Sequence, residues 1–311
     1  MTETVDATRD SGEPTLAFIG AGRAGSALAR AFAGVGHRVV AVHSRSTAHA
    51  AELASATGAE VAPTALAAMR AADLTFATVP DAELAGLAAT LAATGPALSG
   101  RSLVHCSATH GPDVLSAMRA TTASIGAFHP LQALAGASSA PLLRGSSFVV
   151  EAPEPLRSTL LTLVADLGGH VLDLPPGSRA LYHAAAVLAG NAPLVLLARA
   201  TSLLEEAGVD AATAHRALSA LLAGAARNAA EGGAAGALTG PVVRGDAETV
   251  ARHLDVLSAD PNARELYRRL SLEALGLAGL GGREAVADVL VAAAPRKSRP
   301  TSKVVAHPRV A

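Results

Sequence analysis

Three glycines near the start of the chain place the strongest constraint on its fold. The stretch from residue 17 to residue 32 reads AFIGAGRAGSALARAF, so Gly20, Gly22 and Gly25 follow the spacing G-x-G-x-x-G. An apolar stretch typical of a β-strand precedes them and an alanine-rich stretch typical of a helix follows, which is the context that this pattern requires. The first glycine allows a tight turn, the second lets the backbone approach a pyrophosphate, and the third lets the helix pack closely on the strand.

This turn predicts a site for the phosphates of a dinucleotide. The unpaired N–H groups and the positive dipole end at the start of the helix would face those phosphates. A glycine-rich turn that binds no ligand is the alternative, and the flanking strand and helix favour the binding site over it. The predicted binding residues are Gly20, Ala21, Gly22, Arg23, Ala24 and Gly25.

The first half of the chain alternates short β-like runs with helical stretches. Nearly continuous apolar strands joined through helices indicate a parallel sheet that is covered on both faces. We therefore predict an α/β fold of the Rossmann type for residues 14–175. The predicted strands are 15–20, 38–44, 73–80, 102–108, 123–130, 146–152 and 170–175, and the predicted helices are 23–34, 47–57, 81–94 and 155–167.

The pattern changes after LPPGS at residues 174–178, and no strand pattern follows. We predict an all-helical second domain over residues 176–294. Its predicted helices are 178–207, 210–231, 246–258, 261–279 and 282–293. The polar, acidic residues 1–13 and the basic, proline-containing residues 295–311 are predicted to be disordered.

Composition argues against several classes of protein. The 25 lysines and arginines nearly balance the 26 aspartates and glutamates, so net charge suggests neither a nucleic acid nor a membrane surface as partner. The single cysteine, Cys106, allows no internal disulfide and fits the cytoplasm. The apolar run 184–198 contains Asn191 and Pro193 and is shorter than the roughly 20 residues of a membrane span.

The end of the second predicted strand indicates which dinucleotide would bind. An NAD-preferring site carries an acidic residue about 20 residues after the glycines. Residues 39–49 read VVAVHSRSTAH and contain no acid, but they offer Ser44, Arg45 and Ser46 to a 2′-phosphate. A solvated polar loop is the alternative. We predict NADP(H) as cofactor.

The predicted strand 73–80 runs into TVPD, at the edge of the sheet where ligands bind in such folds. We predict that Val79 and Pro80 lie beside the adenosine half of the cofactor. A helix that begins with proline and carries Asp81 in its first turn is a compatible structural interpretation.

Two clusters of polar side chains also lie at predicted strand ends. One contains His105, Ser107, Thr109 and His110, and the other contains His129 and Gln132. We predict that Ser107 orients a substrate and that His129 and Gln132 bind it. The three histidines could in principle hold zinc, but their spacing matches no ligand pattern and Cys106 is expected to point to the opposite face. We therefore predict no metal.

The stretch RALYHAAAVLAGNAPLVLL, residues 179–197, begins the predicted second domain. His183, Val187 and Asn191 follow the spacing i, i+4, i+8, so they share one side of a helix. Pro193 is expected to kink this helix near Ala189. His183 is a candidate proton donor, and a buried His183–Asn191 pair that only joins the domains is an equal alternative.

A loop in the second half, LTGPVVRGD, offers a further candidate. The guanidinium of Arg244 could bind a substrate carboxylate or phosphate through its planar fork, whereas Asp246 is predicted to cap the following helix.

With FIGAGRAGSALA, FHPLQ, LYHAAAVLAGN and LTGPVVRGD in place, residues 15–294 resemble a family of bacterial proteins. These pair a Rossmann-like NADP-binding domain with a C-terminal helical domain of unknown function, which is similar to the C-terminal domain of 6-phosphogluconate dehydrogenase. More distant similarity extends to prephenate dehydrogenase, pyrroline-5-carboxylate reductase and ketopantoate reductase. The resemblance implies NADP(H)-linked reduction of a C=O or C=N group and dimerisation through the helical domain.

One departure limits the transfer of site residues. The β-hydroxyacid dehydrogenases, which are also similar, place a catalytic lysine four residues before an asparagine on this helix. Here His183 occupies the lysine-like position, Val187 follows four residues later, and Asn191 comes only at eight.

The sequence thus predicts a cytoplasmic, homodimeric NADP(H)-dependent oxidoreductase that reduces a small, carboxylate-bearing substrate such as a ketopantoate-like 2-keto acid. His183 would donate the proton, Asn191 and Ser107 would orient the substrate, and Arg244 would bind its charged end. The alternative is a non-catalytic NADP(H)-binding sensor or regulatory module on the same fold.

Overall fold

The computed structural model describes residues 13–93 and 98–294, and the chain divides into two compact units that separate after Ala192. The sequence placed this boundary after residue 175 instead. The first unit also holds helix α6, Arg179–Gly190, because the ring of Tyr182 packs against Ala108 and Val149 of the sheet domain. The predicted disordered ends lie, apart from Glu13, outside the described residues.

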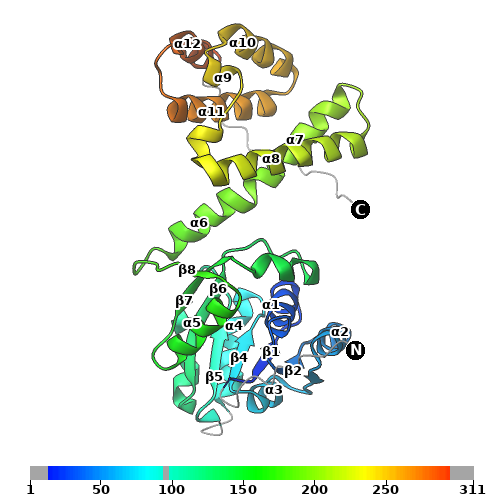
Figure 1. Ribbon diagram of the computed structural model, residues 1–311, viewed down its shortest axis with the longest axis vertical. Coiled ribbons are helices and arrows are strands. Elements are labelled where there is room, and N and C mark those ends of the chain that lie inside the picture. Colours follow the sequence, from blue (N-terminus) through cyan, green and yellow to red (C-terminus); the bar gives the residue numbers. More distant parts are fainter. Residues whose placement is uncertain (1–12, 94–97, 295–311) are drawn as a thin grey trace, which may run out of the picture. The chain divides into compact units, whose positions relative to one another are not determined.

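The first unit contains one eight-stranded sheet in the order β3-β2-β1-β4-β5-β6-β7-β8 (Figure 1). Its first six positions follow the doubly wound Rossmann order. All neighbouring strands are parallel except β6 and β7, whose connection contains a short 3-10 segment, Ala137–Leu143, instead of a crossover helix. The strands are β1 Leu16–Ile19, β2 Val39–His43, β3 Glu60–Val61, β4 Leu74–Ala77, β5 Ser102–His105, β6 Ser124–Pro130, β7 Ser147–Glu151 and β8 His170–Val171.

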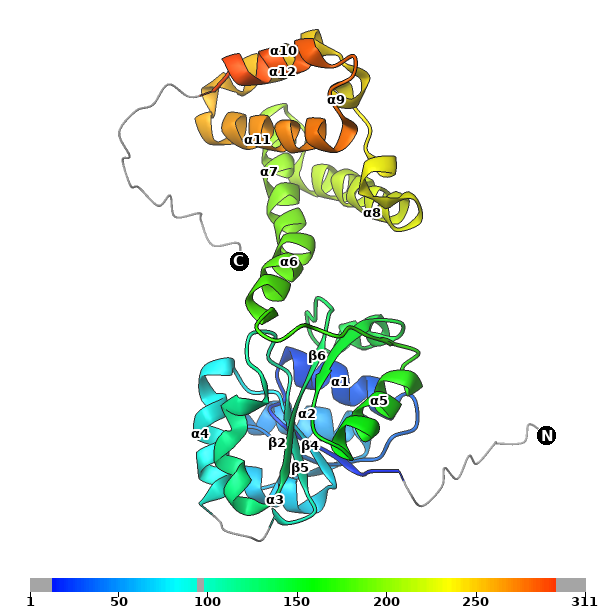
Figure 2. The same cartoon turned by 90° about the vertical axis from the view of Figure 1, so that its left-hand side faces the viewer.

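Helices cover both faces of this sheet, as Figure 2 shows for α4 on one side and α1 and α5 on the other. The face under α1, α2 and α5 buries all five phenylalanines of the chain, and Phe18 stacks on Phe76 with ring centroids 5.1 Å apart. The face under α3 and α4 is lined by smaller aliphatic side chains. The helices are α1 Arg23–Ala33, α2 Thr47–Thr57, α3 Ala65–Ala71, α4 Asp81–Ala92 and α5 Leu156–Asp166, with a further 3-10 segment at Pro112–Thr121. The predicted α/β sheet fold is confirmed.

The described part of the second unit is entirely helical, as predicted. Its core joins α9, α10, α11 and α12, which lie together in Figures 1 and 2 and bury Val250, Leu254 and Leu275 between them. The helices are α7 Ala192–Glu206, α8 Ala211–Ala237, α9 Pro241–Arg244, α10 Ala247–Val256, α11 Pro261–Ala278 and α12 Glu284–Ala292.

The predicted helix 178–207 is in fact two helices, α6 and α7, which separate at Asn191. Pro193 lies in the first turn of α7, where its missing N–H breaks no hydrogen bond. The break therefore falls just after the kink that the sequence placed near Ala189.

Helices α7 and α8 carry few contacts of their own. No residue of α7 is buried, and α8 buries only Ala214. The stretch Arg179–Glu206 is long and apolar enough to cross a membrane by length and composition. The apolar run 184–198 alone is shorter than a membrane span, but α6 and α7 together are long enough.

Candidate functional site

The glycine-rich turn between β1 and α1 is fixed by close packing on the end of β4. Gly20 has a φ of +110°, and a Cβ there would lie 2.7 Å from the backbone oxygen of Thr78. The hydroxyl of Thr78 donates a hydrogen bond to the oxygen of Gly20 at 2.6 Å. A Cβ at Gly25 would collide with that same Gly20 oxygen. These contacts hold the start of α1 close to the ends of β1 and β4.

Gly22 differs from its two neighbours because a Cβ there would meet nothing within 4 Å. It is the N-cap residue of α1, where no side chain caps the helix and the first turn contains no acidic residue. The N–H groups at this helix start are therefore available to an anion. The open space above Gly22 and the uncapped helix fit a pyrophosphate.

A cavity of about 850 Å³, here called the nucleotide pocket, opens beside this turn. It is built from the carboxyl ends of β1, β2 and β4 and from one side of α4. Among the residues predicted to bind cofactor, it brings together Gly20, Ala21, Gly22, Ser44, Arg45, Ser46, Val79 and Pro80. Arg23, Ala24 and Gly25 do not line it and form the first turn of α1 instead.

The rim of the nucleotide pocket contains an ion pair that the sequence analysis did not anticipate. The guanidinium of Arg45 lies 2.9 Å from the carboxylate of Glu83 on α4, and the Arg45 side chain is 79% exposed. Ser46 caps α2 by accepting a hydrogen bond from the N–H of His49 at 3.3 Å. The loop after β2 thus carries no acidic residue, and the carboxylate at this rim comes from α4 and pairs with Arg45.

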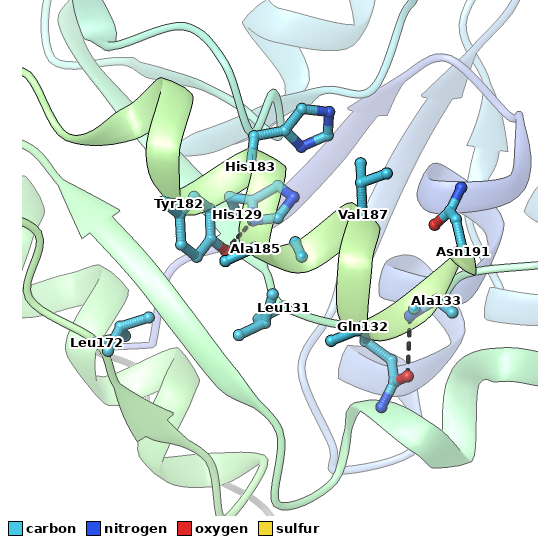
Figure 3. A pocket seen from close by; sticks show the side chains of 13 residues that line it. His129, Leu131, Gln132, Ala133, Leu172, Tyr182, His183, Ala185, Val187 and Asn191 are labelled. Atoms are coloured by element: carbon cyan, nitrogen blue, oxygen red, sulfur yellow. Dashed lines mark hydrogen bonds between the residues drawn. The ribbon is translucent and has the colours of Figure 1, made fainter. Parts of the chain in front are cut away.

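A second cavity of about 520 Å³, here called the substrate pocket, is formed by α6 and by the chain after β6 (Figure 3). It brings together four of the residues predicted to act on a substrate, namely His129, Gln132, His183 and Asn191. Most of its remaining lining is apolar, and Tyr182 adds a hydroxyl. An apolar cavity with a few convergent polar groups is typical of a site for a small molecule.

Helix α6 is anchored to the sheet domain by Arg179 in its first turn. The Arg179 guanidinium contacts the carboxylate of Glu151 at 3.0 Å and donates hydrogen bonds to the carbonyl oxygens of Ser107 and Ala108 at 3.4 and 3.3 Å. One turn later, Tyr182 is buried against the same unit. These contacts determine which side of α6 faces the cavity.

Tyr182 and His129 form the most constrained polar pair of the substrate pocket. The tyrosine hydroxyl and the Nδ1 atom of His129 lie 2.7 Å apart, and the two rings are perpendicular with centroids 5.6 Å apart. Burial raises the pKa of Tyr182 to about 12. Burial, followed by the positive charge of Arg179, lowers the pKa of His129 to about 4. Both groups are therefore neutral at physiological pH. Sequence reasoning missed Tyr182, although it lies next to His183.

The other predicted residues of this pocket are engaged to different degrees. Gln132 donates to the oxygen of Leu142 at 3.2 Å and accepts from the N–H of Ala133 at 2.8 Å, so its amide holds a loop together. His183 is half-buried and Asn191 is exposed at the end of α6. The spacing of these last two brings both to the cavity.

Ser107 lines neither pocket and belongs to a hydrogen-bonded turn after β5. Its hydroxyl donates to Asp81 at 2.7 Å and accepts from the N–H groups of Thr109 and His110 at 3.2 Å each. Burial works against ionisation of Asp81, but the hydrogen bonds from Ser107 and Thr109 prevail and lower its pKa. The Ser107 hydroxyl thus stabilises this turn and has no lone pair free for a substrate.

His105, which the sequence analysis weighed as a metal ligand, is fully buried. Its Nδ1 accepts from the N–H of Ser107 at 3.1 Å and its Nε2 lies 3.0 Å from the oxygen of Gly111. Burial lowers the pKa of His105 to about 4. No group of three or more metal-ligating side chains is found in the described part of the chain. Arg244 is an exposed residue at the end of α9 and belongs to the second unit.

Family models match both parts of the chain. Residues 4–130 match the model of a Rossmann-like domain, and residues 146–274 match the model of a domain of unknown function, DUF2520. The chain therefore combines a Rossmann-like domain with a DUF2520 domain, which confirms the resemblance stated from the sequence. No curated protein matches the sequence.

Solved structures share this architecture over most of the chain. A presumed NADP oxidoreductase from Bacteroides fragilis is 25% identical, with a TM-score of 0.68 over 84% of this chain and 98% of its own. A Thermotoga maritima protein is 21% identical, with a TM-score of 0.64 over 85% and 98%. The 1-pyrroline-5-carboxylate reductase from Streptococcus pyogenes is 14% identical, with a TM-score of 0.59 over 91% and 99%. At these levels of identity, the similarity to the last two structures shows the fold alone.

Proposed function

We propose that this protein is an NADP(H)-dependent oxidoreductase that reduces a C=O or C=N group of a small, carboxylate-bearing substrate. The observation that carries the proposal is the nucleotide pocket. An uncapped helix start, an open glycine and the Ser44–Ser46 loop line one cavity at the carboxyl ends of the central strands. Ligands bind at this edge of a doubly wound sheet.

The proposed cofactor is NADP(H), because the loop after β2 offers a guanidinium where an NAD-preferring site offers a carboxylate. Arg45 would bind the 2′-phosphate, and the N–H groups around Gly22 would bind the pyrophosphate. The Bacteroides fragilis protein is itself described as an NADP oxidoreductase, which supports the same choice. When bound, NADPH supplies the hydride for the reduction.

The substrate pocket would hold the reducible group against α6. Its walls are mostly apolar, and its polar groups, His129, Tyr182, His183 and Asn191, can orient a carbonyl or imine. The name of the Streptococcus pyogenes relative describes the reduction of a cyclic C=N compound that carries a carboxylate. On the C=O side, a 2-keto acid such as ketopantoate stays the first candidate substrate.

The proposal is tested by mixing the protein with NADPH and either ketopantoate or 1-pyrroline-5-carboxylate and following the loss of nicotinamide absorbance. Saturable turnover with either compound supports an oxidoreductase. Saturable NADPH binding without turnover would contradict it and support a sensor or regulatory module. Omission of each substrate in turn controls for slow oxidation of free NADPH.

We also propose that the protein is a homodimer in the cytoplasm, and that the second copy covers α7 and α8. Leu194, Val195 and Leu221 are 59, 66 and 68% exposed on helices that bury almost nothing within one chain. Helices of this kind need a partner surface. A membrane is the less favoured partner, because Arg199 within the same stretch forms an ion pair with Asp260 at 2.8 Å.

A further inference from the structure

Two side chains in the wall of the substrate pocket, Tyr182 and His129, are joined by a hydrogen bond and held in place by their surroundings. The Tyr182 hydroxyl lies 2.7 Å from Nδ1 of His129 (Figure 3). The ring of Tyr182 packs against Ala108 and Val149, and His129 is part of β6. Both residues also line the cavity. Their hydroxyl and imidazole are therefore oriented before any ligand arrives.

We propose that Tyr182 is the proton donor of the substrate pocket and that His129 positions its hydroxyl by donating Nδ1–H to the phenolic oxygen. In this arrangement the phenolic proton is free to point at the substrate. The inference rests on the proposed function and names the acid of the same site. It replaces His183, which the sequence favoured for this role.

The step balances as follows in atoms and electrons. A hydride bonds to the carbon of the C=O or C=N group, and the π electron pair moves onto the oxygen or nitrogen. The O–H bond of Tyr182 breaks and its proton bonds to that atom, so the O–H electron pair stays on the phenolate. The N–H of His129 stabilises this phenolate until water returns a proton. The two electrons come from the proposed NADPH.

The electrostatics of the pair suit this role. The Tyr182 phenol is protonated at physiological pH, and burial raises its pKa further, to about 12. Burial keeps the His129 imidazole neutral by lowering its pKa to about 4, so one ring N–H remains to be donated. The positive charge of Arg179 favours the phenolate once the proton has left. The charged or titratable groups that act on the pair are Arg179, His183, His105 and Asp81.

His183 is less suited because, among the described residues, no hydrogen bond orients its ring. It is the next residue of α6, so its side chain is turned by about 100° from that of Tyr182. It lines the same cavity, but within the described residues no hydrogen bond to its side chain is found. A group that transfers a proton is oriented by a second group, and this condition is met by Tyr182.

A matched pair of tyrosine variants tests the inference. The chain has two tyrosines, and each forms a hydrogen bond with a histidine. In the second unit, the Tyr267 hydroxyl lies 2.9 Å from Nδ1 of His253. Tyr182→Phe and Tyr267→Phe each remove one such hydroxyl and keep the ring. We expect Tyr182→Phe to lower kcat about 10²–10⁴-fold, with NADPH affinity unchanged, and Tyr267→Phe to leave kcat within about twofold.

Variants of His129 test the positioning role separately. The side-chain amide of asparagine can place an N–H near the former Nδ1 position, whereas alanine cannot. We therefore expect His129→Asn to retain more of kcat than His129→Ala. Equal losses in both variants would show that the Nδ1–H does not hold the hydroxyl.

A spectroscopic measurement supplies a readout that does not depend on turnover. With ¹³Cζ-labelled tyrosine, the protein gives two signals, and Tyr267→Phe assigns the one from Tyr182. Addition of pantoate or proline, the reduced forms of the two test compounds, together with NADP⁺ should shift the Tyr182 signal and leave that of Tyr267 in place. Binding of both ligands without a shift would show that the hydroxyl does not touch the substrate.

The outcomes separate the inference from the proposed function. If the unaltered protein turns over neither test compound, the proposed function fails, and the inference fails with it. If it turns over a compound and Tyr182→Phe does so equally fast, only the inference is overturned. Loss of kcat in His183→Ala together with an active Tyr182→Phe would return the role to His183.

Discussion

Gly22 and Gly25 are three residues apart in one turn, yet alanine should harm each of them for a different reason. At Gly25 the added methyl would collide with the Gly20 oxygen, whereas at Gly22 it would enter open space. Gly25 is required by packing within the protein. Gly22 is required only if a ligand comes close to the backbone.

This contrast gives a prediction about stability and binding. Gly25→Ala should lower the melting temperature markedly, because backbone of β1 or α1 must move. Gly22→Ala should fold with an almost unchanged melting temperature but bind NADPH at least about tenfold more weakly, since the methyl occupies the space proposed for the pyrophosphate. Thermal unfolding and calorimetric titration of both variants measure the two effects. Full NADPH affinity in Gly22→Ala would mean that no phosphate lies there.

The ion pair at the rim of the nucleotide pocket gives a second prediction. Arg45→Ala should weaken NADPH binding by about 10–100-fold, the usual worth of a hydrogen bond to a charged group, and leave NADH binding nearly unchanged. Glu83→Gln should strengthen NADPH binding, because the carboxylate competes for Arg45 and repels a phosphate. Isothermal titration with both dinucleotides distinguishes these variants. A parallel loss of NADH and NADPH affinity would contradict the role of Arg45.

Residue types in a known pattern could be predicted from the sequence, whereas partners from distant segments could not. Five residues stand in recognisable local contexts, and the structure places them at two cavities: Gly20, Gly22, Arg45, His129 and His183. Glu83 and Tyr182 were missed because their partners, Arg45 and His129, are far away in the chain. Ser107 was predicted to orient a substrate because the sequence does not show that the N–H groups of Thr109 and His110 occupy its lone pairs.

Among the elements, length decided what could be predicted. The longer strands and helices, in which the apolar pattern repeats several times, lie close to their predicted positions. β3 has two residues and α3 has seven, so both are too short for their pattern to repeat often enough to be recognised. The division between α6 and α7 was also missed, since Pro193 is as compatible with a first helical turn as with a kink.

The N-cap of α11 gives a prediction at the scale of an element. Asp260 accepts hydrogen bonds from the N–H groups of Asn262 and Ala263, both at 3.0 Å. Asp260→Ala should lower the free energy of unfolding by about 1 kcal/mol, as loss of an N-cap usually does. Asp255→Ala, on the exposed side of α10, is the matched control and should change little.

Asp260 should also make the difference in unfolding free energy between Asp260→Ala and the unaltered protein depend on pH. The hydrogen bond from Ala263 is the largest cause that lowers the pKa of Asp260 in the folded state. Its contribution is therefore complete above the pKa of an unfolded aspartate, about 3.9, and is lost as the pH falls through the lower folded value. Urea unfolding at pH 7 and at acidic pH should show the gap between Asp260→Ala and the unaltered protein closing. A gap that widens in acid would contradict this assignment.

For the whole molecule, the open question posed by the fold is what covers α7 and α8. If a second copy of the chain covers α7 and α8, Val195→Glu should produce a monomer, because the charge would enter the dimer interface. Val256→Glu, at a valine of α10 that is 74% exposed compared with 66% for Val195, should stay dimeric. Light scattering after gel filtration reports the mass of each variant. A monomeric unaltered protein would rule out this partner.

The central claim, that the Rossmann-like unit binds NADP(H), is tested most directly by isothermal titration of the unaltered protein with NADPH and with NADH. The account predicts one saturable site per chain and an affinity for NADPH at least about tenfold higher than for NADH, since only NADPH carries the 2′-phosphate that Arg45 would bind. Equal affinities would contradict the assignment of the Ser44–Ser46 loop, and the absence of saturable binding by both dinucleotides would contradict the proposed function itself.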